Sequence, residues 1–89
     1  MKLKKGFVLR TVCGERIIVG EGLDAINFGR LLCLNETAAW LWEKAGQQGD
    51  FTIDSLVEAL CEEYEVTPEQ AKNDVTAMVA EWQKVGVIE

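Results

Sequence analysis

The chain has 89 residues, 48% of them hydrophobic, and a formal net charge of −6, which suits one domain, residues 1–89, with a small core. It has no run of about 18 apolar residues that could span a membrane, and it has no histidine, the commonest general base and a frequent metal ligand. The composition therefore argues against a membrane protein and a metal site, predicts no cofactor, and makes an enzyme a poor expectation.

Two runs rich in branched and aromatic side chains, Phe7–Val12 and Arg16–Val19, are predicted to be strands. Between them lies Cys13-Gly14-Glu15, where Gly14 can adopt the positive φ that a tight turn requires. We therefore expect a β-hairpin.

A third strand is predicted over Arg30–Leu34, after an irregular stretch. Strand alternation places Arg30, Leu32 and Leu34 on one face and Leu31 and Cys33 on the other. Since both faces carry apolar groups, this strand should be covered on both sides or be open to a partner.

A first helix is predicted from Glu36 to Ala45, capped by Asn35 and ending near Gly46. A second begins at Thr52 or Asp50. The expected buried stripe of the first helix is Ala38, Leu41, Trp42 and Ala45, and Trp40 lies outside it. The expected buried stripe of the second helix is Ile53, Leu56, Val57, Leu60 and Tyr64.

The third helix has the clearest start signal, with Thr67 as its cap, Pro68 at the first helical position, and Gln70 three residues after the cap. Gly86 should end it, and the residues that follow should pack against the core. Its expected stripe is Ala71, Val75, Met78, Val79 and Trp82.

Three strands followed by three helices predict an α+β domain with a three-stranded antiparallel sheet. The short connection 65–68 between the last two helices makes the arrangement winged helix-turn-helix-like. Three strands cannot close a barrel, so a soluble protein must cover, shorten or use the sheet edges.

The charges argue against nucleic acid as a partner. Residues 1–34 carry six basic and three acidic groups, whereas residues 35–89 carry three basic and twelve acidic ones. The third helix, which would enter a DNA groove, sets Lys72 and Lys84 against Glu69, Asp74 and Glu81. Such a helical half repels phosphate backbones and anionic lipid alike.

The three cysteines, Cys13, Cys33 and Cys61, are odd in number and widely spaced, which indicates structural thiols rather than a disulfide framework. The start Met-Lys-Leu-Lys-Lys resembles the charged end of a signal peptide, but Arg10 and Glu15 interrupt any apolar segment after it. We expect an unprocessed cytoplasmic protein.

Asp54-Ser55-Leu56, at a helix start in a small acidic protein, resembles the attachment serine of acyl carrier proteins. Those carriers are all-helical, whereas strands precede Ser55 here. A small polar residue also suits a first helical turn, and this is the more economical interpretation.

The run Leu34–Trp42 resembles the Leu-Asn-Glu-Thr/Ser-small-small-x-Ile/Leu-Trp signature of the PqqD family, the small proteins of pyrroloquinoline quinone synthesis and their relatives. The similarity continues through Leu56–Tyr64, Asn73–Val75 and Val85–Ile88, and so covers nearly the whole chain. The main departure is Gly20–Phe28, which is longer and less regular than the family's second turn.

The resemblance implies a non-catalytic peptide chaperone that binds the leader of a ribosomally made precursor peptide and presents it to a modifying enzyme, often a radical SAM enzyme. In the family the leader adds as a strand beside the third strand, against the third helix. An edge strand with apolar groups beside an amphipathic helix also suits β-augmentation on physical grounds. The expected peptide-binding residues are Arg30, Leu31, Leu32, Cys33, Leu34, Asp74, Val75 and Met78.

Three alternatives remain at the level of sequence. Val75 and Met78 fit the hydrophobic core as well as they fit a groove. The chain could instead be a carrier-like scaffold that uses Ser55. It could also be an interaction domain whose open edge pairs with a second copy to give a homodimer.

Overall fold

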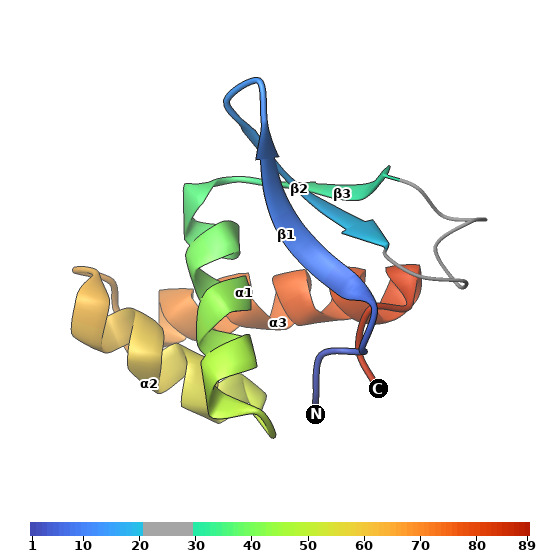
Figure 1. Ribbon diagram of the computed structural model, residues 1–89. Helices are drawn as coiled ribbons and strands as arrows, with labels where there is room; N and C mark the ends of the chain where they lie inside the picture. The colour runs from blue at the N-terminus through green and yellow to red at the C-terminus, as the bar shows by residue number, and fades with distance from the viewer. Residues whose placement is uncertain (21–29) are drawn as a thin grey trace.

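The computed structural model of the chain describes residues 1–20 and 30–89, with the backbone alone at residues 30 and 31. Three strands precede three helices (Figure 1), which confirms the predicted α+β class. The irregular stretch Gly20–Phe28 lies, beyond its first residue, outside the described residues. The elements are β1 Phe7–Val12, β2 Glu15–Gly20, β3 Arg30–Leu34, α1 Glu36–Gln48, α2 Ile53–Glu63 and α3 Pro68–Val85.

The sheet is antiparallel throughout, in the order β1-β2-β3. Its hairpin turns at Cys13 and Gly14, with φ angles of 52° and 79°. Positive φ at both turn residues is the geometry whose twist matches that of paired strands. The predicted hairpin is therefore confirmed, and Cys13 is the residue that adopts an unfavourable backbone conformation to make it.

The register places Ile18 opposite Leu9 and Leu32, and this row of side chains packs on the hydrophobic core. The pairing then shifts between Ile18 and Val19, so that Arg30 is the partner of Val19. The alternation predicted along β3 therefore holds over residues 32–34, and residue 31 is the extra residue in the backbone register. An extra residue of this kind is a β-bulge, which is common on edge strands.

The helices cover one face of the sheet (Figure 1), and the core lies between these two layers. Trp42 of α1 and Trp82 of α3 meet edge to face, with ring centroids 5.1 Å apart and planes at 81°, a favoured aromatic geometry. Phe51, in the connection between α1 and α2, is completely buried. The sequence patterns did not predict this, because Phe51 lies outside every helical stripe.

Helix α1 differs from its prediction in two respects. It runs through Gly46 to Gln48 and ends at Gly49, whose N–H donates to the Ala45 carbonyl oxygen at 3.1 Å. The predicted end of the helix near Gly46 is wrong, because Gly46 lies inside the helix. The buried stripe contains Ala39, while Ala38 is only half-buried, because Ala38 lines a pocket beside α3.

The predicted helix starts are confirmed by their side-chain caps. Asn35 Oδ1 accepts from the Ala38 N–H at 2.8 Å, and Thr67 Oγ1 accepts from the Gln70 N–H at 3.1 Å. Helix α2 starts after Thr52, which selects one of the two predicted starts. Each such cap contributes about 1 kcal/mol of stability.

The two ends of the chain lie together (Figure 1), joined by a bridge between Leu3 and Ile88. The amino group of Met1 donates to Asp50 Oδ1 at 2.8 Å, and this contact holds the pKa of Asp50 below its usual value. The N-terminal segment is thereby fixed beside the helical layer. Within residues 1–20 and 30–89, the structure contains no helix with the length and apolar character needed to cross a membrane.

The turn gives a first testable prediction. A Cβ at Gly14 would meet no atom within 4 Å, so Gly14→Ala should act through the backbone conformation alone and destabilise the fold by about 1 kcal/mol. The neighbouring Cys13→Gly should instead stabilise the fold, because glycine adopts the positive φ of this position without a steric penalty. Urea unfolding measures both, and equal midpoints for Gly14→Ala and the unmodified chain would contradict the assigned turn.

Candidate functional site

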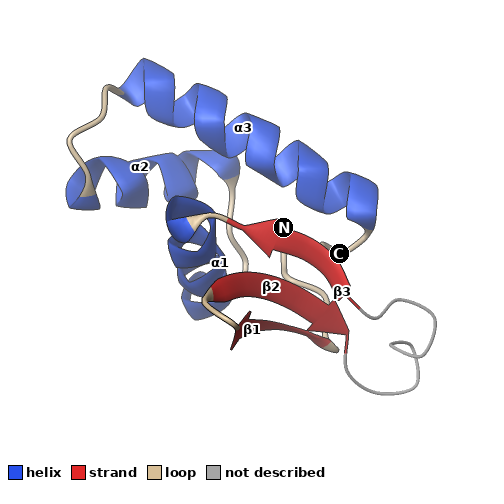
Figure 2. Ribbon diagram, turned by 90° about the horizontal axis from the view of Figure 1, so that it is seen from above, coloured by secondary structure: helices blue, strands red, loops and turns tan. Residues whose placement is uncertain are grey.

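Within the described part of the chain, strand β3 has a backbone partner on one side only. It pairs with β2, and among the described residues no other segment pairs with its outer edge. Helix α3 runs along this outer side (Figure 2), while the main close backbone contacts between the helical layer and β3 come from α1. An unpaired strand edge is a template for a further strand.

The register identifies which backbone groups face outward. In a hairpin with a two-residue turn, the flanking residues Val12 and Glu15 form a hydrogen-bonded pair. Because bonded and non-bonded pairs alternate, Leu32 and Leu34 should bond to β2, and the N–H and C=O of Cys33 should point to the open edge. Cys33 is also exposed.

A pocket of about 370 Å³ lies between the start of α1 and the middle of α3, next to the end of β3. Its walls combine apolar groups with the carboxylate of Asp74, so an apolar side chain and a cation could both be accommodated. The cap hydrogen bond fixes one wall, because it orients the Asn35 side chain. The lining residues are Asn35, Thr37, Ala38, Leu41, Asp74, Ala77 and Met78.

The structure brings two of the predicted site residues together in this pocket, exposed Asp74 and half-buried Met78. Val75, with 0% exposure, belongs to the core, as the alternative interpretation had it. Val75 therefore packs beneath the surface of α3 and offers no exposed atoms to a ligand.

On the strand side, Leu32 and Leu34 are half-buried against the core. Arg30 and Leu31 belong to β3, but their side chains lie outside the described part of the chain. The sequence did not identify the other five lining residues of the pocket as site residues: Asn35, Thr37, Ala38, Leu41 and Ala77. The signal for Ala77 was its spacing of three residues from Asp74, which places both on one face of α3.

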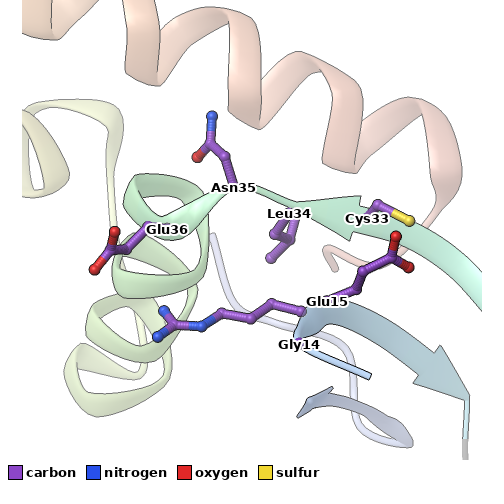
Figure 3. A pocket seen from close by; sticks show the side chains of 7 residues that line it. Gly14, Glu15, Cys33, Leu34, Asn35 and Glu36 are labelled. Atoms are coloured by element: carbon purple, nitrogen blue, oxygen red, sulfur yellow. The ribbon is translucent and has the colours of Figure 1, made fainter. Parts of the chain in front are cut away.

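A second hollow, of about 580 Å³, lies at the hairpin end of the sheet and was not predicted. Figure 3 shows Leu34 between two groups of polar side chains, with Glu36 on one side and Glu15 and Cys33 on the other. Asn35 lines both hollows. The C-terminal end of β3 therefore lies between two recesses.

Ser55 is used for helix capping. Its hydroxyl donates to Gln48 Oε1 at 2.6 Å and accepts from the Thr52 N–H at 2.9 Å, while Thr52 Oγ1 accepts from the Ser55 N–H. The two bonds with Thr52 form a capping box. The contacts account for Ser55 as a structural residue and give no support to a carrier role.

Comparison with known proteins adds a family and a fold. The family described as "Coenzyme PQQ synthesis protein D (PqqD)" matches residues 15–88. No curated protein matches the chain.

Two solved structures share the fold. "TbiB1 in Complex with the TbiA(beta) Leader Peptide" has a TM-score of 0.77 and 17% identity, over 100% of this chain and 95% of that chain. "Lasso peptide synthetase B1 complexed with the leader peptide" has a TM-score of 0.73 and 19% identity, over 99% and 95%. The order of three strands and three helices is thus a known architecture.

Hydrogen exchange of the protein alone tests the open edge. The amides of Leu32 and Leu34, which bond to β2, should exchange at least about tenfold more slowly than the outward amide of Cys33. The measurement is residue-resolved exchange by NMR. If Cys33 proves as slow as its two neighbours, the edge is already covered.

Proposed function

We propose that this chain, which belongs to the coenzyme PQQ synthesis protein D (PqqD) family, binds the leader segment of a ribosomally made precursor peptide and presents it to a modifying enzyme. The observation that carries this proposal is the unpaired edge of β3, which faces α3 and ends at a pocket. Both similar structures are described as complexes with a leader peptide, which supports the same use of this fold.

The leader would add as a fourth strand on β3, bonding to the outward backbone groups of Cys33 and its neighbours. Four or five backbone hydrogen bonds contribute about 5 kcal/mol in total at about 1 kcal/mol each. Association costs about 4 kcal/mol or more, and micromolar binding needs about 8 kcal/mol net. Side-chain contacts must therefore supply most of the affinity.

The pocket between α1 and α3 is the place for such a contact. Leu41 and Ala77 line it with apolar atoms, half-buried Met78 adds an adaptable thioether side chain, and Asp74 adds a negative charge. A leader with one large apolar residue near a lysine or arginine would fit this combination. The acidic helical half of the chain favours such a basic leader.

The proposed role requires no chemistry from this chain. Strand addition fixes the direction and register of the leader, and the rest of the precursor is held near the catalytic centre of a separate enzyme, such as a radical SAM enzyme. Tethering of this kind raises the effective concentration of the substrate at the enzyme.

Filling the pocket should weaken leader binding. Ala77 lines the pocket and Ala80 does not, although both are exposed on α3. Ala77→Phe should lower the affinity at least about tenfold, or about 1.4 kcal/mol, and the matched Ala80→Phe should change it less than about twofold. Calorimetric titration with leader peptides encoded next to this protein's gene measures both, and equal losses would exclude the pocket.

The charge of Asp74 should matter modestly, because exposed ion pairs contribute about 0.2 to 1 kcal/mol. Asp74→Asn should weaken binding of a leader that contains lysine or arginine by up to about fivefold, and salt should reduce this difference. Glu62→Gln, an exposed change on α2, is the control. An unchanged affinity for Asp74→Asn at low salt would show that Asp74 does not contact the leader.

A further inference from the structure

A second groove, the β1–α1 groove, lies at the opposite edge of the sheet from β3. It has a volume of about 480 Å³ and separates β1 from the last turns of α1, which lie on the same side of the molecule in Figure 1. Its lining is mainly apolar: Leu3, Phe7, Val8, Leu9, Trp42, Glu43, Gly46 and Gln47. The leader-binding proposal makes no use of it.

Gly46 is the unusual member of this lining. It lies inside α1 and neither caps nor ends the helix, although glycine costs about 1 kcal/mol relative to alanine at such a position. A Cβ on Gly46 would meet only Leu3 Cδ1, at 3.8 Å, which is an ordinary contact. Internal packing therefore does not require glycine at this position. A larger side chain here would occupy the groove that Gly46 lines.

The neighbouring strand β1 forms the other outer edge of the sheet as far as residues 1–20 and 30–89 show. In the register set by the hairpin, Arg10 and Val8 bond to β2, so the backbone groups of Leu9 and Thr11 should face outward. The groove thus combines apolar walls with outward backbone donors and acceptors. This combination suits an extended chain better than a compact ligand.

The charges around the groove indicate the character of that chain. Lys2, Lys4 and Lys5 are exposed on the segment that carries Leu3, and Glu43 is the one carboxylate in the groove lining given above. Pairing of β1 with a second copy would bring together two segments, residues 2–12, that each carry four basic side chains and no acidic one, and like charges repel each other. An acidic segment of a different protein is therefore the better match.

We propose that the β1–α1 groove binds an extended segment of a partner protein in which acidic residues alternate with apolar ones. The apolar side chains enter the groove toward Trp42 and Gly46, and the carboxylates lie near the lysines of the N-terminal segment. Since β3 is the opposite edge, the chain can hold this partner and a leader at the same time. The groove then gives the domain a second docking site, independent of leader binding.

The test uses a short synthetic peptide in which glutamate alternates with valine, titrated into the isotopically labelled full chain and followed by NMR. Shifts should cluster at Leu3, Leu9 and Gly46. A peptide with lysine in place of glutamate should bind at least about tenfold more weakly. Shifts confined to β3 and α3, equal binding of both peptides, or no binding at millimolar peptide would each overturn the proposal.

The matched variants are Gly46→Leu, which fills the groove, and Gly46→Ala, which restores helix propensity with little added volume. Binding of the acidic peptide should fall at least about tenfold in the first and less than about twofold in the second, while leader affinity stays unchanged in both. Equal losses of affinity in the two variants would show that the acidic peptide does not bind in the groove. Concentration-dependent self-association that only Gly46→Leu abolishes would identify a second copy as the occupant instead and overturn the proposed acidic partner.

Discussion

A sheet of three strands leaves two strands with backbone groups that no neighbour pairs, and the rest of this structure follows from that constraint. Strand β2 is paired on both sides, whereas β1 and β3 pair with β2 alone among residues 1–20 and 30–89. Unpaired N–H and C=O groups must be solvated or bonded to another chain. In the described residues one helical layer packs on the sheet and no segment pairs with either edge, and this is why we propose that an extended chain adds at each.

The two edges differ in what surrounds them. Helix α3 lies along β3, and its place there is fixed by the contact of Trp82 with Trp42. Helix α3 brings Asp74 to the pocket next to the end of β3, while the lysines of the N-terminal segment flank Leu3, which lines the β1–α1 groove. We therefore propose a basic guest for the β3 edge and an acidic one for the β1 edge. Under these proposals, the opposite charge preferences of the two strand edges would prevent each peptide from binding at the wrong edge.

Local signals accounted for most of the secondary structure. The side chains of Asn35 and Thr67 bond backbone N–H groups three residues ahead, so their effect is contained within one turn. Gly14 acts in the same local way at the hairpin. The end of α1 was wrongly predicted at Gly46, because a glycine that ends a helix and a glycine inside a helix look the same in the sequence. Phe51 was missed because its burial comes from contacts with distant segments.

The order of strands and helices, their caps, the division of charge and the signature around Leu34–Trp42 can all be read from the chain, because each depends on residues that are near one another in it. Packing of the layers, in contrast, makes Val75 a core residue and Ala77 a pocket residue, and it places α1 and α3 on either side of that pocket. The periodicity of a helix defines which residues share a face, but the exposure of that face depends on what packs against it. That is a property of the assembled layers.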